Sequence, residues 1–292
     1  MRGLVLKGIG GFYFVETEVG IFRAKARGVF KKERNLLMVG DEVEIAVSEN
    51  AEEDSWITDI LPRKNSFLRP PISNIDMLMV VFAVANPEPN FVVIDKMLAM
   101  TERKGIEPIV CINKADLANA ENLDRITKVY ERIYRTFVTN AKTEDGIAKI
   151  REAVCGYKVA LAGPSGVGKS TIVNALVPGS NMEIGEISDK TSRGRHTTRH
   201  VEMIHLGNGY VFDTPGFTSL DLDNDIEARD IAYYYPELRR ASENCKFSDC
   251  MHINEHECGV KTALFSGEVS KERYVTYLGI VEELRERGKK YE

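Results

Sequence analysis

The sequence predicts a multidomain chain with a small N-terminal β-barrel, a central α/β domain and an α-rich C-terminal region. Short alternating runs fill the first 65 residues, strand and helix patterns alternate through the middle, and cysteines and histidines crowd together before a closing helix. The 292 residues, 43% of them apolar, are enough to fill several cores. We place the domains at residues 1–65, 75–220 and 221–292, with a proline-containing linker at 66–74.

Bulk composition excludes several classes of protein. The longest strongly apolar run, Met77 to Ala85, is far shorter than the roughly 20 residues of a membrane-spanning helix. No secretory signal pattern opens the chain, so we expect a cytoplasmic protein without membrane attachment, and a monomer. The net charge of −5 argues against a wholly basic nucleic-acid-coating protein. Any contact with RNA must therefore be regional.

The first 65 residues predict an antiparallel barrel of the oligonucleotide-binding (OB) type, because the runs GFYFVET, VGIFRAKA, DEVEIAV and WITDIL are separated by turn residues. In FRAKARGVFKKER, every second residue from Arg23 to Arg27 is basic, which puts three cations on one face of a strand near Phe22 and Phe30. A basic stripe beside aromatic rings favours RNA contact over the alternative, a solvated charged face. The RNA-contact candidates are Arg23, Lys25, Arg27, Lys31, Lys32 and Arg34.

The central region predicts a parallel sheet with helices on both faces, because apolar strand runs alternate with amphipathic segments. The expected helices are Asn90–Lys104, Asn119–Arg135 and Glu144–Val154. Beyond about residue 221 the sequence becomes acidic and rich in tyrosine, and residues 267–292 have the spacing of a closing helix.

A phosphate-binding loop is the strongest motif. The stretch YKVALAGPSGVGKSTIVNAL matches G-x-x-x-x-G-K-[ST] between an apolar strand and a helix-compatible segment, the context that makes this motif specific. Its glycines let backbone N–H groups turn inward around phosphate oxygens. We expect Lys169 to contact the β and γ phosphates as a catalytic residue, and Ser170 to bind Mg²⁺.

A second motif selects the base. In PIVCINKAD, a strand ends in Asn113, Lys114 and Asp116, and a carboxylate at Asp116 can accept hydrogen bonds from N1–H and N2 of guanine. Adenine has a lone pair at N1 that would repel this carboxylate, so the motif favours GTP over ATP. The alternative interpretation is an ordinary turn after a strand, where Asn and Asp are common. The nucleotide-binding candidates are Asn113, Lys114, Asp116, Asn140, Ala141, Lys142, Gly163, Pro164, Ser165, Gly166, Val167, Gly168, Lys169, Ser170, Thr171, Asp213 and Gly216.

Two further segments predict γ-phosphate and Mg²⁺ contacts. The loop at 178–199 ends in GRHTTRH, where either Thr197 or Thr198 could complete the Mg²⁺ shell. In GYVFDTPGF, a strand ends at Asp213, which suits Mg²⁺ held through water, and Gly216 can approach the γ phosphate. Phe217 stands where many GTPases carry a water-orienting glutamine. His196 is our candidate for that task, with a solvated loop histidine as the alternative.

The stretch NCKFSDCMHINEHEC predicts a structural metal site. Three thiolates and one imidazole form a closed tetrahedral set that suits one Zn²⁺ ion. The expected ligands are Cys245, Cys250, His252 and Cys258, with His256 as a rival to His252. The remaining cysteines, Cys111 and Cys155, stand in apolar context and are predicted to be core residues.

Taken together, NKAD, GPSGVGKST, GRHTT, DTPGF, CKFSDCMH and RYVTYL resemble the circularly permuted GTPases that assist assembly of the small ribosomal subunit, the RsgA/YjeQ-type family. The resemblance covers essentially the whole chain. It implies an OB barrel, a GTPase domain reopened at a different loop so that NKxD precedes the phosphate loop, and a zinc domain. It also supports zinc on the four residues named above and His196 as the replacement for glutamine.

Two positions depart from the usual pattern. Asn140 stands where a serine is usual in the base-contacting loop. Gly166 stands where potassium-activated GTPases carry an asparagine, so we expect no potassium requirement.

The resemblance implies an enzyme that converts GTP and water to GDP and phosphate, and that acts late in maturation of the small (30S) subunit. Its partners would be that subunit and its 16S rRNA. One alternative is a nucleotide-gated RNA-binding module whose hydrolysis is incidental. Another, a metabolic P-loop kinase, is disfavoured by the guanine-selecting loop and the lack of an obvious acceptor-site base.

Overall fold

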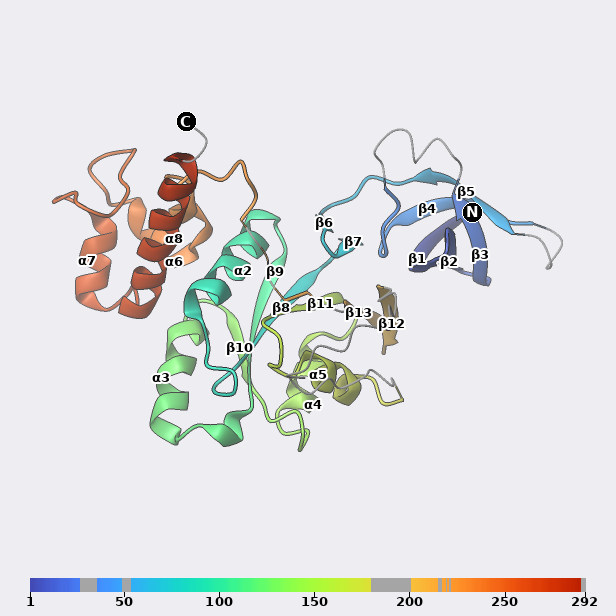
Figure 1. Ribbon diagram of the computed structural model, residues 1–292, viewed down its shortest axis with the longest axis horizontal. Coiled ribbons are helices and arrows are strands. Elements are labelled where there is room, and N and C mark those ends of the chain that lie inside the picture. The colour runs from blue at the N-terminus through green and yellow to red at the C-terminus, as the bar shows by residue number, and fades with distance from the viewer. Residues whose placement is uncertain are drawn as a thin grey trace. The chain divides into compact units, whose positions relative to one another are not determined.

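The computed structural model describes residues 1–26, 36–48, 54–179, 201–214, 217–218, 220 and 222–289 (Figure 1). The chain divides into two compact units, each described here by itself. The first unit comprises Met1–Leu78, Ala148–Leu161 and Ser170–Phe217. The second unit comprises Met79–Ile147, Ala162–Lys169 and Thr218–Glu292.

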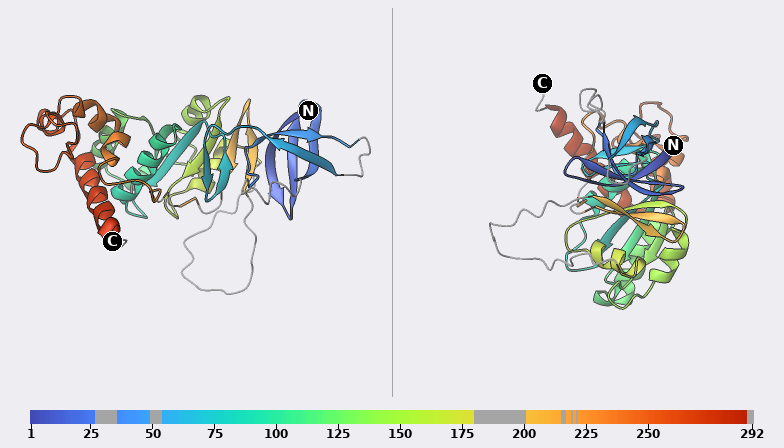
Figure 2. Two further views of the ribbon diagram at one scale, coloured as in Figure 1. Left: turned by 90° about the horizontal axis from the view of Figure 1, so that it is seen from above. Right: turned by 90° about the vertical axis from the view of Figure 1, so that its right-hand side faces the viewer.

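The first unit begins with a five-stranded barrel. Its strands are β1 (Arg2–Ile9), β2 (Phe12–Thr17), β3 (Gly20–Ala26), β4 (Glu42–Ala46) and β5 (Ser55–Ile60). They follow the order β1–β2–β3–β5–β4, and β4 pairs back onto β1 to close the barrel (blue in Figure 2). Alternate side chains fill its interior: Val5, Val15, Ala24, Val43, Ile45 and Ile57. The predicted N-terminal barrel is confirmed.

A short hairpin occupies the segment that the sequence predicts as a linker. Strands β6 (Ser66–Leu68) and β7 (Pro71–Ser73) pair antiparallel. Ile72 and Ser73 are fully buried, and Ser73 Oγ donates to the buried carboxylate of Asp41 at 2.6 Å. Arg63 Nε donates to the same Asp41 oxygen at 2.6 Å. The hairpin is therefore packed onto the barrel by a buried polar anchor.

The rest of the first unit extends the barrel sheet. It contains β11 (Lys158–Ala162), α5 (Lys169–Leu176), β12 (Glu202–Leu206) and β13 (Gly209–Asp213), with most of α4 (Ile147–Ala153). Strand β13 pairs parallel with β11 and antiparallel with β12. Strand β12 in turn pairs with barrel strand β1 through Lys7 and Glu202. One sheet thus runs from β11 into the barrel.

The second unit holds the strand order β10–β9–β8, from β8 (Met77–Ala83), β9 (Glu107–Asn113) and β10 (Arg135–Val138). All side chains of β8 are buried, as expected for a strand covered on both faces. Helices α2 (Phe91–Arg103) and α3 (Ala120–Glu131) begin after the capping side chains of Asn90 and Asn119, and a short helix η1 (Ala115–Leu117) lies between them. The predicted central α/β region is confirmed.

The C-terminal part of the second unit is helical. It contains η2 (Ile231–Tyr234), α6 (Pro236–Ser242), α7 (Gly259–Ser266) and the closing helix α8 (Lys271–Lys289). Helix α8 and η2 both pack against α2. Helices α8 and α2 are labelled in Figure 1. Among the helices of the described residues, none has both the length and the apolarity needed to cross a membrane.

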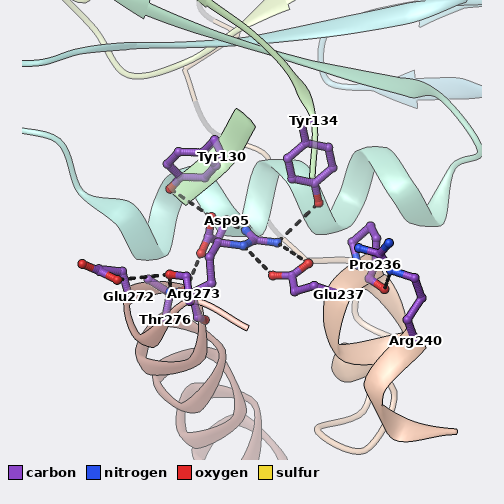
Figure 3. Close-up of polar contacts among 10 residues, drawn as sticks. Asp95, Tyr130, Tyr134, Pro236, Glu237, Arg240, Glu272, Arg273 and Thr276 are labelled. Atoms are coloured by element: carbon purple, nitrogen blue, oxygen red, sulfur yellow. Dashed lines mark hydrogen bonds and ion pairs between the residues drawn. The ribbon is translucent and has the colours of Figure 1, made fainter. Parts of the chain in front are cut away.

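A buried ion cluster joins these helices (Figure 3). The guanidinium of Arg273 on α8 donates to Asp95 on α2 at 2.5 Å and to Glu237 on α6 at 2.8 Å. Its central carbon lies 4.3 Å from the ring centre of Tyr235, and Tyr134 accepts a further bond. All three charged side chains are at most 3% exposed. Burial raises the pKa of Asp95, and the Arg273 charge opposes that rise.

The prediction that Cys111 and Cys155 are core residues is right for the first and wrong for the second. Cys111 on β9 is fully buried, and burial raises the pKa of its thiol to about 12. Cys155, by contrast, is exposed. It lies in the turn after α4, next to the buried Val154.

Candidate functional site

One asparagine side chain ties three loops together in the second unit. Asn113, the last residue of β9, is buried. Its Nδ2 donates to the carbonyl of Val167 in the phosphate loop at 2.8 Å, and its Oδ1 accepts from the backbone N–H of Ala141 at 3.1 Å. Thr139 Oγ1 donates to the same Oδ1 at 3.1 Å. The Asn113 side chain therefore holds the base-selecting motif, the 140–142 loop and the phosphate loop together.

Around this anchor, the remaining base-loop candidates stay available. Asp116 is exposed at the start of η1, and Lys142 is also exposed. Lys114 takes a left-handed backbone conformation and bonds through Nζ to the carbonyl of Asn86. The backbone N–H of Lys142 donates to Asn140 Oδ1 at 3.2 Å, so Asn140 shapes its own loop where a serine was expected. Thr139 was not predicted, and its place before the loop was the only signal for it.

The phosphate loop has a backbone that requires glycine at two close approaches. Gly163 has φ +155°, and a Cβ there would collide with the carbonyl of Val81. Gly168 has φ +98°, and a Cβ there would collide with Nδ2 of Asn113. Both positions are therefore closed to side chains, which keeps the loop near the base-selecting strand. This geometry fits a loop whose backbone N–H groups bind phosphate.

Lys169, at the first position of α5, has few polar partners. Its Nζ donates to the carbonyls of Gly163 at 2.5 Å and Pro164 at 2.9 Å. Burial lowers the pKa of its ammonium to about 8. A phosphate would give this half-buried cation the anionic partner that two neutral carbonyls do not supply. The side chain of Lys169 thus fits the phosphate-binding role.

In the first unit, β13 ends at Asp213, whose carboxylate has one unusual oxygen. Asp213 Oδ1 is buried and makes no hydrogen bond among the described residues. Burial and the nearby Glu202 charge raise the pKa of Asp213 to about 6, although the Lys7 charge opposes the rise. The next residue, Thr214, is buried and donates to the carbonyl of Leu161 at 3.4 Å. A buried carboxylate oxygen without a partner among the described residues is expected where a cation or a metal-bound water completes the site.

Four other candidates near the γ phosphate lie outside the described residues. These are His196, Thr197, Thr198 and Gly216. Phe217 is described and is 1% exposed, with its ring 5.5 Å from the ring of Phe67 in the hairpin. It packs into the core of the first unit, so this position does not present a side chain to water.

The four predicted metal ligands converge in the C-terminal region. One ligand atom from each of Cys245, Cys250, His252 and Cys258 lies within 4.8 Å of all the others. His252 Nδ1 lies 3.4 Å from Cys258 Sγ and 3.6 Å from Cys245 Sγ. His256 is not part of the group. The arrangement resolves the choice between the two histidines in favour of His252.

The chemistry of this cluster fits a metal such as zinc. Burial raises the pKa of the Cys250 thiol to about 12, and burial lowers the pKa of His252, which keeps its imidazole neutral. Thiols of that kind ionise when a metal binds them. The Glu255 carboxylate accepts three backbone N–H bonds, from Met251, Ile253 and Asn254. This loop geometry holds the ligands together.

Two of the RNA-contact candidates are placed on the outer face of the barrel. Arg23 and Lys25 on β3 both pair with Asp54, at 2.6 and 2.9 Å. Both also lie over the ring of Phe12, at 5.0 and 5.1 Å from its centre. Phe22, which the sequence placed beside the stripe, packs toward the barrel core instead. The other candidates, Arg27, Lys31, Lys32 and Arg34, lie outside the described residues.

Comparisons with known proteins agree with these features. The RsgA GTPase family matches residues 60–223, and the RsgA N-terminal domain family matches residues 2–57. A small ribosomal subunit biogenesis GTPase RsgA from Caldanaerobacter subterraneus subsp. tengcongensis is 41% identical, over 99% of this chain and 98% of the relative. The protein of the same description from Agathobacter rectalis is 43% identical, over 99% and 100% of the two chains.

Solved structures show the same architecture. The crystal structure of YjeQ from Thermotoga maritima matches with a TM-score of 0.82 and 35% identity, over 97% of this chain and 98% of that one. YloQ, described as a circularly permuted GTPase, matches with a TM-score of 0.81 and 33% identity, over 98% and 95% of the two chains. With its base-selecting loop ahead of its phosphate loop, this chain belongs to the RsgA family of circularly permuted GTPases.

Proposed function

We propose that this protein hydrolyses GTP to GDP and phosphate and acts in biogenesis of the small ribosomal subunit, as the names of its relatives state for them. The observation that carries the GTPase part is the Asn113 side chain, which bonds to the phosphate loop and to the 140–142 loop at once. A guanine held by Asp116 and phosphates held by the glycine-rich loop would thereby be read together.

The roles at the nucleotide follow from residue chemistry. Asp116 accepts from guanine, Lys169 binds the β and γ phosphates, and Ser170 and Asp213 hold Mg²⁺, Asp213 through water. The unpartnered Oδ1 of Asp213 supports this role. Thr197 or Thr198 completes the metal shell, and His196 positions the attacking water. A bound Mg²⁺ ion would supply charge neutralisation for the phosphates.

The C-terminal region and the N-terminal barrel make the ribosomal contacts in this proposal. Zn²⁺ on Cys245, Cys250, His252 and Cys258 holds the C-terminal region in shape. The outer face of the barrel, with Arg23 and Lys25, contacts 16S rRNA, together with the basic residues of the 27–35 segment. The Asp54 carboxylate must give up these two side chains when phosphate binds them.

The decisive experiment measures GTP hydrolysis with and without purified small subunits, with ATP as the control nucleotide. We expect slow GTP hydrolysis by the free protein and strong stimulation of that hydrolysis by small subunits. With ATP in place of GTP, we expect no hydrolysis in either condition. The buried position of Phe217 favours slow intrinsic turnover, because no side chain there can orient water. Nucleotide-dependent binding to subunits without any stimulation would instead favour the alternative, an RNA-binding module with incidental hydrolysis.

A further inference from the structure

Three strands of the first unit place three charged side chains in one row. Glu202 on β12 is the cross-strand partner of Asp213 on β13. It is also the partner of Lys7 on barrel strand β1. Directly opposed residues on neighbouring strands point to the same face of a sheet, with Cβ atoms about 5 Å apart. The row therefore reads Asp213, Glu202, Lys7 across one face.

The burial of neighbouring residues supports this common face. Met203 and Phe212, the next cross-strand pair, are both buried on the opposite side. Glu202 and Lys7 form an ion pair, and their side chains are 32% and 35% exposed. Both charges are therefore partly solvated but fixed in order, with the negative charge next to Asp213 and the positive charge one strand farther away.

This order gives the ion pair a direction. Strands are spaced about 4.8 Å apart, so Lys7 is roughly twice as far from Asp213 as Glu202 is. Coulomb energy falls with distance, and the nearer negative charge dominates at the end of β13. Two like charges directly opposed, Asp213 and Glu202, are unfavourable unless a cation lies near them. Lys7 relieves Glu202 on one side, and the unpartnered Oδ1 of Asp213 remains on the other.

We propose that Glu202 and Lys7 are positioning residues for Mg²⁺: Glu202 strengthens the attraction of the Asp213 site for the cation, and Lys7 from the barrel moderates it. The proposal rests on the proposed role of Asp213 in binding Mg²⁺. It makes the barrel part of the electrostatics of the Asp213 site within the first unit, because Lys7 belongs to β1. Neither residue is required to touch the metal.

The test compares single substitutions with a charge swap. The full-length protein is loaded with a fluorescent GDP, and the free Mg²⁺ concentration that half-slows nucleotide release is measured. We expect Glu202→Gln to raise this concentration roughly three- to tenfold, and Lys7→Gln to lower it by about twofold. The swap Lys7→Glu with Glu202→Lys preserves the ion pair but puts a cation opposite Asp213. The swap should raise the concentration more than Glu202→Gln does.

A matched swap separates electrostatics from structure. Lys158 on β11 and Glu42 on barrel strand β4 pair at 3.1 Å. Lys158 is the cross-strand partner of Tyr210, at the other end of β13 from Asp213. Lys158→Glu with Glu42→Lys should therefore leave the Mg²⁺ dependence unchanged, as a purely structural pair would.

The outcomes distinguish this inference from the proposed function. If the Lys7–Glu202 swap and Glu202→Gln both match the wild type within twofold while Asp213→Ala raises the half-effective Mg²⁺ concentration at least tenfold, the positioning role is refuted and the Asp213 assignment stands. If Asp213→Ala changes nothing, the proposed Mg²⁺ role of Asp213 fails. Because Glu202→Gln introduces no new charge, it remains informative even if the swapped protein does not fold.

Discussion

Two polar clusters of this protein treat buried charge in opposite ways. Around Arg273, each charged group finds an internal partner, and Asp95, Glu237 and the guanidinium are all nearly inaccessible (Figure 3). At the end of β13, Asp213 keeps a buried oxygen with no partner among the described residues. The first arrangement satisfies its buried charges within the fold, whereas the second becomes favourable when a ligand arrives. Whether a buried charged group has a partner within the protein thus distinguishes the structural cluster from the functional one.

Metal removal tests the cluster of three cysteines and one histidine in the C-terminal region, whose stability should depend on a bound zinc ion. Chelation of zinc from the protein should lower the stability of the C-terminal region by more than about 5 kcal/mol, because structural zinc supplies folding free energy directly. Urea unfolding followed by circular dichroism, with metal content measured in parallel, checks this. Cys258→Ser should behave like chelation. Cys155→Ser, outside the cluster and exposed, is the matched control and should retain one zinc ion per chain.

The Arg273 cluster gives the next largest effect. Arg273→Met removes the cation from between two buried carboxylates, and we expect a loss of about 3–5 kcal/mol in the free energy of unfolding. Arg135→Met is the control, because Arg135 pairs with Glu107 on the surface and both side chains are 46% exposed. That change should cost under about 1 kcal/mol. Equal losses for the two variants would contradict the assigned structural role of the buried cluster.

The same contrast explains what the sequence could and could not predict. The residues proposed to bind a nucleotide lie in contiguous stretches such as NKAD and GPSGVGKST, so their spacing could be recognised from sequence alone. Arg273 and Asp95 are 178 residues apart, and no local pattern joins them. The available signal was Asp95 itself, a lone acid within the apolar helix FVVIDKMLAM.

Short elements were also hard to predict. Strands β6 and β7 have three residues each, too few to show alternation, and their prolines suggested a linker. Phe22 stood next to the basic stripe in sequence, yet period two sends it to the barrel core while Phe12, a neighbour across strands, lies under Arg23 and Lys25. Local spacing predicts which face a residue takes, but cross-strand neighbours depend on register.

Asn113 combines features of both clusters. Its buried side chain makes three internal hydrogen bonds, and two of them reach the proposed nucleotide-binding loops. Asn113→Ala should cost about 2–3 kcal/mol of stability, because it leaves the Ala141 N–H and the Val167 carbonyl unpaired. It should also weaken GDP binding by a larger factor than this stability loss explains at a temperature where the variant is folded. Thr139→Val, which removes only one of the three bonds, should give a smaller change in both measurements.

Asp213→Ala should have the smallest effect on stability and one of the largest on ligand binding. This substitution removes a buried oxygen that has no partner in the part of the chain that the structure describes, so the free energy of unfolding without nucleotide should stay within about 1 kcal/mol of the wild type, or rise. The Mg²⁺-dependent part of GDP affinity should fall at least tenfold. Asp95→Ala makes the matched comparison: it should cost several kcal/mol, because it strips a partner from Arg273. If both variants unfolded at the same urea concentration, saturation of partners would not distinguish a structural carboxylate from a functional one, and Asp213 would have to be reassigned to the fold.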